Sequence, residues 1–267
     1  MNDREVGRYW DESAEAWTFL ARRGYDVYRD LVNTPAFFEM LPDVTGLAGL
    51  DVGCGEGHNT RLLAKRGAIM SAVDISAAFI AHAQDFDAPD FDGMDIHYAI
   101  ASAQKLPFEA ASFHFATAFM SLMDMPRPDL ALAETARVLK TGGFFQFSIS
   151  HPCSTTPHRR HVRDAQGRTL ALEVGGYFEY LDGEIDEWLF SAAPRELKAG
   201  LRKFRIPRFQ RTLSDWINMI AGAGLAIEQV AEPYASEETA MRYPVVADTR
   251  VAPYFLLVRC RKISGLS

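Results

Sequence analysis

Leu50-Asp51-Val52-Gly53-Cys54-Gly55-Glu56-Gly57 is the stretch of sequence that decides the fold. It joins an apolar run, residues 47–52, to a helical pattern that begins at His58. Glycine accepts positive φ and has no Cβ, so a ligand can lie directly on the backbone of such a loop. The free N–H groups and the positive dipole end of the following helix favour an anionic ligand group. The segment therefore predicts a strand, a ligand-binding loop and a helix, in that order.

The alternation of strands and helices continues after this loop. Four more apolar runs are separated by helical or turn-rich patterns, and they lie at residues 69–73, 96–100, 113–120 and 144–149. Such alternation is typical of a parallel sheet with crossover helices. Ser76 is expected to cap the helix after the second run, and the helix that begins at Pro128 is expected to end at Gly142-Gly143.

The last part of the chain has a different pattern. Thr212 and Asp215 form a capping box at the start of a helix. Two strand-like runs follow, at residues 225–230 and 254–258, with no helical pattern between them. We expect these two strands to pair antiparallel at one edge of the sheet.

Asp74, at the end of the second apolar run, indicates which ligand the glycine loop binds. In doubly wound sheets an acidic residue at this position lies beside the loop and accepts hydrogen bonds from ribose hydroxyls. The dinucleotide pattern Gly-x-Gly-x-x-Gly, read from Gly53, requires a small residue where this chain has His58. The sequence therefore predicts an adenosine-containing cofactor and disfavours NAD and FAD.

Four segments resemble, in the same order, the motifs of class I S-adenosylmethionine-dependent methyltransferases that act on small molecules. They are residues 50–57, Ala72-Val73-Asp74-Ile75-Ser76, residues 102–108 with Ser112-Phe113, and Arg137-Val138-Leu139-Lys140-Thr141-Gly142-Gly143. The resemblance spans residues 50–150. It implies a Rossmann-like, doubly wound α/β fold with a seven-stranded, mostly parallel sheet whose last strand is antiparallel. It also implies S-adenosylmethionine as the cofactor and S-adenosylhomocysteine as the product.

The resemblance further implies which residues bind the cofactor, and these are Asp51, Gly53, Gly55, Gly57, Asp74, Ile75, Ser102, Ala103, Ala118 and Phe119. Asp51 and the glycine backbone would hold the methionine end, and Asp74 would bind the ribose. Ala103 would meet the adenine edge through its N–H group. Ser102 stands where the family usually has an acid that accepts a hydrogen bond from the adenine amino group. The end of the fourth strand would contact the methionine amine and the sulfonium.

The two segments that lie outside the motifs are expected to surround the acceptor. Residues 1–40 should form an N-terminal helical cap, in which Tyr9 and Trp17 lie on one helical face. These rings would shield the sulfonium by a cation–π contact, or simply pack an amphipathic helix. Residues 151–208, rich in aromatic side chains, should form a lid and substrate-selecting wall, or simply pack onto the body.

We therefore expect one catalytic domain over residues 1–267. In addition to the cap and the insertion, residues 41–150 would form the S-adenosylmethionine-binding core, and residues 209–267 would complete the sheet.

His151, at the end of the fifth predicted strand, is the candidate catalytic base. An imidazole titrates near neutrality and can accept a proton from a hydroxyl or amine, although a lone histidine can equally be structural. Pro152-Cys153 resembles the Pro-Cys nucleophile of cytosine-C5 methyltransferases without their usual context. The spacing of His151, Cys153, His158 and His161 fits no common zinc pattern, so we expect no metal.

Composition restricts the partners. The net charge of -7 argues against general affinity for nucleic acid, which needs clustered Lys and Arg. No stretch approaches the roughly 20 apolar residues of a membrane span, and the N-terminus lacks the apolar core of a signal peptide. Three widely spaced cysteines suggest reduced thiols. We expect a cytoplasmic protein, monomer or homodimer, that acts on a small-molecule acceptor and binds neither nucleic acid nor membrane.

The predicted reaction is an in-line displacement in which an O, N or C nucleophile of the acceptor, which is expected to be partly aromatic, takes the sulfonium methyl. Three alternatives stay open at this point. They are a methyltransferase acting on tRNA or protein, a nicotinamide-dependent oxidoreductase, and a module that binds S-adenosylmethionine without turning it over. The sequence does not name the acceptor.

Overall fold

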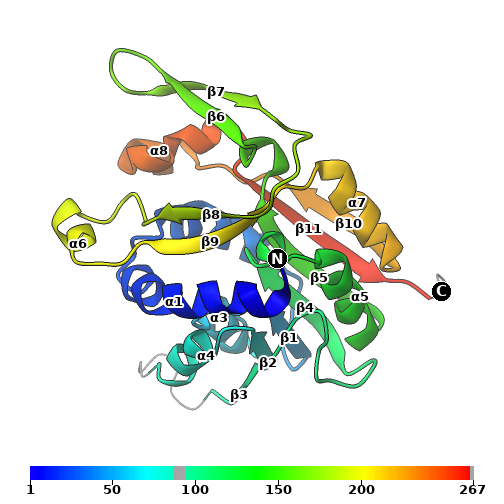
Figure 1. Cartoon of the computed structure of the whole chain (residues 1–267). Coiled ribbons are helices and arrows are strands. Elements are labelled where there is room, and N and C mark those ends of the chain that lie inside the picture. The colour runs from blue at the N-terminus through cyan, green and yellow to red at the C-terminus, as the bar shows by residue number, and fades with distance from the viewer. Residues whose placement is uncertain (87–93, 265–267) are drawn as a thin grey trace.

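A seven-stranded sheet with the order β10-β11-β5-β4-β1-β2-β3 forms the centre of the computed structural model, which describes residues 1–86 and 94–264 (Figure 1). Its strands are β1 (Ala48–Val52), β2 (Ile69–Asp74), β3 (Ile96–Ile100), β4 (Phe113–Phe119), β5 (Leu139–Ser150), β10 (Leu225–Ala231) and β11 (Phe255–Lys262). β1 to β5 run parallel, and β11 lies antiparallel between β5 and β10. The predicted fold class is therefore confirmed. Residues 265–267 of the expected C-terminal segment lie outside the described residues.

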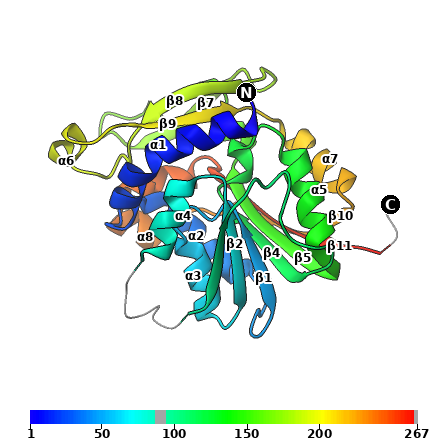
Figure 2. The same cartoon turned by 60° about the horizontal axis from the view of Figure 1, so that its bottom comes forward.

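Helices cover both faces of this sheet (Figure 2). The crossovers β1–β2 and β2–β3 place α3 (His58–Lys65) and α4 (Ala77–Gln84) on one face, and α5 (Pro128–Val138) and α7 (Leu213–Gly222) pack together on the other. The predicted caps are confirmed. The Ser76 hydroxyl accepts from the Phe79 N–H, and Thr212 and Asp215 form the reciprocal capping box of α7.

The N-terminal segment contains α1 (Asp3–Ala21), a π-helical turn (Arg29–Asn33) and α2 (Thr34–Met40). α1 of the N-terminal segment and the insertion lie along the carboxyl edge of the parallel strands (Figure 1), whereas α2 packs on a face of the sheet near α3 (Figure 2). The insertion forms two antiparallel hairpins, β6 (His158–Arg163) with β7 (Thr169–Gly175) and β8 (Asp182–Trp188) with β9 (Phe204–Phe209), and the short helix α6 (Arg195–Ala199). α1 packs against β9, so α1 and the insertion form one layer over this edge.

Two sequence predictions need correction. The helix that begins at Pro128 ends at Val138 rather than at Gly142-Gly143, because Leu139 already pairs with Phe113 of β4. The two glycines lie inside β5, where its register against β4 shifts. The segment between the last two strands is also partly helical, with α8 (Glu237–Arg242) and a 3₁₀ helix (Pro244–Arg250). α8 buries none of its residues, so no apolar period reveals it in the sequence.

Gly49 in β1 makes room for a phenylalanine in the centre of the core. Phe115 of β4 is fully buried, and a Cβ built on Gly49 would lie 2.2 Å from its ring. Protein cores are close-packed, so the ring cannot move away without displacing its neighbours. The distance between β1 and β4, whose ends carry the loops of the site, therefore depends on this glycine.

Gly49→Ala should destabilise the fold by about 1–3 kcal/mol or more, because the added methyl group overlaps the Phe115 ring. Urea unfolding of the purified variant measures this change. Gly222→Ala is the matched control, since a Cβ at that helical position meets no atom within 4 Å, and it should be neutral or stabilising by up to about 1 kcal/mol. Equal stability of the two variants would contradict the proposed role of Gly49.

Candidate functional site

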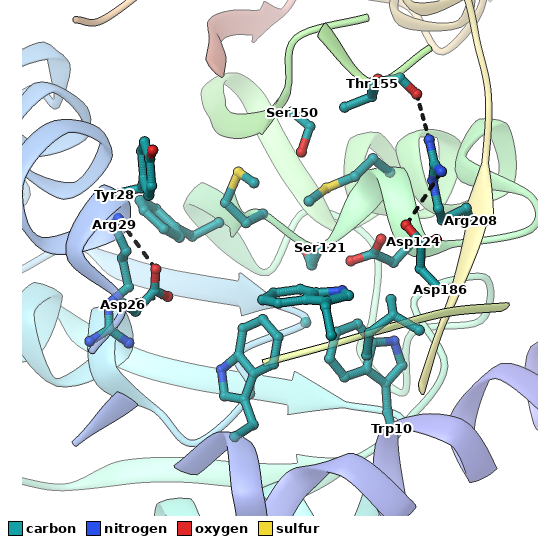
Figure 3. Close-up of a pocket in the computed structure, with 18 of the residues that line it drawn as sticks. Trp10, Asp26, Tyr28, Arg29, Ser121, Asp124, Ser150, Thr155, Asp186 and Arg208 are labelled. Atoms are coloured by element: carbon teal, nitrogen blue, oxygen red, sulfur yellow. Dashed lines mark hydrogen bonds and ion pairs between the residues drawn. The ribbon is translucent and has the colours of Figure 1, made fainter. Parts of the chain in front are cut away.

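A cavity of about 800 Å³ lies beyond the carboxyl ends of β1, β2, β4 and β5 (Figure 3). The strand ends contribute Gly53, Asp74, Phe119 and Ser150 to its lining. Around them stand side chains from the layer above the sheet edge, among which Figure 3 shows Trp10 of α1, Asp186 of β8 and Arg208 of β9. Ligands of open α/β sheets bind at this edge, so the cavity is the candidate site.

The glycine loop and Asp74 meet at the bottom of this cavity as the sequence predicts. The Asp74 carboxylate accepts hydrogen bonds from the Gly55 N–H and the Ser76 N–H, each at 2.8 Å. Gly53 has φ 73°, and a Cβ there would lie 2.4 Å from Cβ of Ser121. Burial raises the pKa of Asp74 to about 6, against the opposing effect of the two N–H donors. Gly53, Gly55, Asp74 and Ile75 all line the cavity.

Three predicted site residues support the loop from behind and are outside the cavity lining. Asp51 is 1% exposed and accepts hydrogen bonds from the hydroxyls of Thr60 at 2.6 Å and Thr117 at 2.9 Å. A Cβ on Gly57, which has φ 83°, would lie 2.6 Å from the Tyr98 hydroxyl. Ala118 is fully buried in β4. Phe119, the next residue and the last of β4, does line the cavity.

Ser102 is likewise outside the lining, while Ala103 is part of it. The Ser102 hydroxyl donates to the carboxylate of Asp3, whose other oxygen accepts from the Gln104 amide at 2.9 Å. Asp3 lines the cavity and comes from the first turn of α1. The tertiary structure thus brings a carboxylate to the place where the predicted site has only a serine. Asp3 carries no signal in the sequence, because the contact joins residues about a hundred positions apart.

Aromatic side chains form one wall of the cavity. Trp17 lines it as predicted, but Tyr9 lies outside the lining with Arg205 over its ring, and the neighbouring Trp10 takes its place. The reason is the helical rotation of α1, which turns Trp10 toward Trp17 at a ring distance of 5.5 Å. The wall is completed from the insertion by Trp188 and Phe190, whose rings lie 5.5 and 4.9 Å from that of Trp17.

His151 does not face the cavity. It is 3% exposed, its Nδ1 accepts from the Cys153 N–H at 3.2 Å, and its Nε2 lies 2.8 Å from a carboxylate oxygen of Glu232. Burial lowers the pKa of His151. His151 is therefore absent from the cavity lining, and its Nε2 lies near Glu232 without meeting the geometry of a hydrogen bond.

Asp124 is a half-buried acid that the sequence analysis does not identify. It belongs to the 3₁₀ turn Leu122–Asp124 after β4 and projects into the cavity beside Ser121 (Figure 3). Within residues 1–86 and 94–264 its carboxyl group has no hydrogen-bond or ion-pair partner, and burial raises its pKa to about 8. The neighbouring Arg208 is already paired with Asp186, at 3.3 Å. Such a group is mostly protonated at pH 7, and a cationic ligand beside it would lower its pKa and favour release of the proton to solvent.

A second polar cluster, also missed, lies in the cavity wall. The Tyr254 hydroxyl donates to Asp248 Oδ2 at 2.8 Å, and the Tyr28 hydroxyl lies 3.0 Å from the same oxygen. His161 Nε2 lies 2.6 Å from the Tyr254 hydroxyl oxygen. All four residues line the cavity, and they come from three distant parts of the chain.

The charge of the lining favours a cation. Eight acidic side chains line the cavity, namely Asp3, Asp26, Glu56, Asp74, Asp124, Asp186, Glu187 and Asp248. Against them stand the three arginines Arg29, Arg159 and Arg208. Clefts lined by one sign of charge concentrate ligands of the opposite sign. The residues that the structure describes contain no cluster of His, Cys, Asp and Glu suited to a metal ion, and none of their helices is long and apolar enough to cross a membrane.

The sequence is similar to those of methyltransferases. The family described as "Methyltransferase domain" matches residues 50–147. The chain is 33% identical over 175 residues to a ubiquinone biosynthesis O-methyltransferase of Paracidovorax citrulli, covering 64% of this chain and 67% of that protein. It is 30% identical over 196 residues to a fatty-acid O-methyltransferase of Mycolicibacterium smegmatis, covering 71% of this chain and 65% of that protein. The matched part of this chain covers between 41% and 67% of the length of its curated relatives.

The fold has a close counterpart among solved structures. The crystal structure of an S-adenosylmethionine-dependent methyltransferase from Mesorhizobium loti superposes with a TM-score of 0.67 at 28% identity. The match covers 85% of this chain and 96% of that one. The similarity thus extends beyond the segment that carries the glycine loop.

The raised pKa of Asp124 predicts a pH-dependent stability. A carboxyl group that binds its proton more tightly in the folded chain than in the unfolded chain stabilises the fold at low pH, and this contribution is lost as the pH rises to the folded pKa of about 8. Without ligand, this group should make the free energy of unfolding fall between about pH 4 and about pH 8, by up to ~1.4 kcal/mol per pH unit, and the slope should level off above pH 8. Asp124→Asn should flatten this slope in urea unfolding.

Asp129→Asn is the control for this measurement. A hydrogen bond from Arg127 lowers the pKa of Asp129, so that carboxylate stays ionised over the same pH range and its removal should leave the slope unchanged. An Asp124→Asn slope equal to that of the wild type would show that Asp124 does not titrate there.

Proposed function

The chain belongs to the family of S-adenosylmethionine-dependent methyltransferases, and from this membership we propose that it transfers the methyl group of S-adenosylmethionine to a nucleophilic atom of a small molecule. The observation that carries the proposal is the position of the Asp74 carboxylate against the Gly55 N–H, at the bottom of a cavity with a predominantly acidic lining. A cofactor with a positive sulfur suits that charge.

The residues of the cavity fit this cofactor. We assign the ribose to Asp74, the methionine end to the backbone of Gly53 and Gly55, and the adenine to Ala103 and Asp3. The space above Gly55 is open, since a Cβ built there meets no atom within 4 Å. The Asp74 oxygens each have one donor among the described residues and a further lone pair for a hydroxyl. When bound, S-adenosylmethionine supplies a methyl group on a cationic sulfur that an acceptor nucleophile can displace.

The acceptor is proposed to be a small molecule with an aromatic or apolar body that gives O, N or C as the nucleophile. Support comes from the wall of Trp10, Trp17, Trp188 and Phe190 and from a volume of about 800 Å³, near the upper end of the range for small-molecule sites. The two relatives named above are O-methyltransferases, which favours oxygen. The chain's contribution to catalysis would be alignment of the reactants in a site that excludes water.

The cysteines and the net charge bear on the compartment and the partners of the protein. We propose that it acts in the cytoplasm, which is supported by the free thiols of Cys54, Cys153 and Cys260. We propose no nucleic acid partner, which is supported by the net charge of -7.

Calorimetry tests the cofactor and a coupled assay tests the reaction. The protein should bind S-adenosylhomocysteine and not NAD, and in the presence of S-adenosylmethionine and a phenol or a fatty acid it should release S-adenosylhomocysteine. Binding of NAD alone would indicate an oxidoreductase. Binding of S-adenosylhomocysteine with no turnover over a metabolite library would indicate a binding module. Turnover with tRNA or protein alone would indicate the macromolecular alternative.

Asp74→Asn should weaken S-adenosylhomocysteine binding by about tenfold to a hundredfold, because hydrogen bonds to a charged group contribute about 1.5–3 kcal/mol. Calorimetry measures the change, and circular dichroism checks that the variant is folded. Asp85→Asn, at the exposed end of α4, is the control and should bind like the wild type. Unchanged affinity in Asp74→Asn would remove the ribose assignment.

Asp3→Ala should also weaken S-adenosylhomocysteine binding, by about tenfold, if its carboxylate accepts from the adenine amino group. In that background, Ser102→Asp should restore affinity, because it returns a carboxylate to the same place. Glu15→Ala, an exposed acid on the same helix, is the control. Loss of affinity without rescue would mean that Asp3 acts only through the position of α1.

A further inference from the structure

The cluster of Tyr28, His161, Asp248 and Tyr254 has no role in the cofactor site proposed above. It borders the same cavity, but none of its residues lies in the segment 50–147 that matches the methyltransferase family. The two tyrosine rings stack at 5.7 Å with an interplanar angle of 24°, and Asp248 beneath them is 9% exposed. Burying a carboxylate costs free energy, and the hydroxyls of the two tyrosines offset part of that cost.

The hydrogen bonds of the cluster fix the proton positions on His161. The Tyr254 hydroxyl has one hydrogen, which it donates to Asp248 Oδ2. Burial and Asp248 both raise the pKa of Tyr254, so the hydroxyl group keeps its hydrogen. Its oxygen can then only accept at 2.6 Å from His161 Nε2, which must carry the hydrogen of the neutral ring. The lone pair is on Nδ1, for which the described part of the chain provides no hydrogen-bond donor.

The cluster lies next to the end of the sheet where the methyl group is expected. Tyr28 and Tyr254 pack in the same apolar cluster as Phe119 and Met120, which end β4. The backbone carbonyl of Tyr254 accepts from the His151 N–H at 2.9 Å, which ties the cluster to the end of β5. Tyr28 and Ser121 border the same open space in Figure 3. A molecule in contact with the Trp17 wall and the end of β4 can therefore reach this cluster.

We infer that His161 Nδ1 is the general base of the reaction and that the acceptor is a phenol, a flat ring carrying a hydroxyl group. This inference rests on the proposed function. The phenol O–H gives its proton to Nδ1 as its oxygen forms a bond to the methyl carbon and the carbon–sulfur bond breaks. The products are the methyl ether, S-adenosylhomocysteine and an imidazolium that later releases its proton to water, so atoms and charge balance. A flat ring matches the indole wall, and the hydroxyl supplies the donor that Nδ1 lacks.

A carboxylate lies close to His161. Asp248 Oδ2 lies 3.8 Å from Nε2 and is also linked to it through Tyr254. Two arginines also act on the cluster, since the positive charges of Arg159 and Arg163 oppose the raised pKa values of Tyr254 and Tyr28. On β6, Arg159 donates to the Ser154 carbonyl and Arg160 pairs with Glu173 of β7. Arg163 donates to the Gly167 carbonyl, and Arg250 donates to the Ala235 carbonyl. Asp248, at 3.8 Å from Nε2, places a negative charge beside the ring when Nδ1 accepts the proton of the phenol.

The first test needs no turnover. Nitrogen NMR of histidine-labelled protein saturated with S-adenosylhomocysteine should show His161 as the Nε2–H tautomer at high pH. Tyr254→Phe removes the acceptor of that hydrogen and should shift the ring toward a mixture of tautomers, while His158, which is 71% exposed on the same strand, stays unchanged. An Nδ1–H tautomer in the wild type, or a His161 signal that Tyr254→Phe leaves unchanged, would overturn the assignment of the base.

The second test separates the base from the proposed function. His161→Gln should reduce methyl transfer to para-cresol by about a hundredfold or more, the usual contribution of a general base, and transfer to para-nitrophenol much less, because that phenol is largely ionised near neutral pH. His158→Gln should behave like the wild type. S-adenosylhomocysteine affinity should stay within about twofold in both variants, which shows that the cofactor site is intact.

The outcomes of this second test are distinct. Equal losses with the two phenols would overturn the role of His161 as a base and leave a positioning role. Wild-type protein that methylates oleic acid and neither phenol would overturn the acceptor class, since a carboxylate has no proton to give. Wild-type protein that binds no S-adenosylhomocysteine would overturn the proposed function itself.

Discussion

The hydrogen bonds from the Gly55 N–H and the Ser76 N–H to the Asp74 carboxylate hold the site together. They join the loop after β1 to the end of β2, and Ser76 in turn caps α4. Burial alone would favour the neutral form of Asp74, and the two donors offset part of that cost. Because Gly53 and Gly55 have positive φ, the loop can bend around the carboxylate and leave its surface open to a ligand.

The acidic lining of the cavity also makes folding less favourable when the site is empty. Carboxyl groups in a cavity cost free energy of folding, and Asp124 has no partner in the described residues. A cationic ligand lowers that cost when it binds, so the site is more stable occupied than empty. Proteins commonly place such unfavourable groups at functional sites, where stability is exchanged for binding or catalysis.

The acceptor end of the cavity is built from parts of the chain that the methyltransferase motifs do not include. Tyr28 precedes the core, His161 belongs to the insertion, and Asp248 and Tyr254 precede the last strand. The sheet fixes the distance between these segments, since Tyr254 is bound to the end of β5 and β6 leaves from that end. A fold of this kind can keep the cofactor loop and change the acceptor by changing these outer segments.

The sequence by itself determined the sheet, the glycine loop, Asp74 and the caps of α4 and α7, because each depends on contacts within a few residues or on a local period. The tertiary structure alone decided that Asp3 stands beside Ser102 and that His161 meets Tyr254, since these pairs are far apart in the chain and carry no local pattern. It also decided which side of a ring or helix faces the cavity, which is why Trp10 lines it and His151 does not. Local chemistry fixes the elements, whereas the packing of distant segments chooses which side chains reach the ligand.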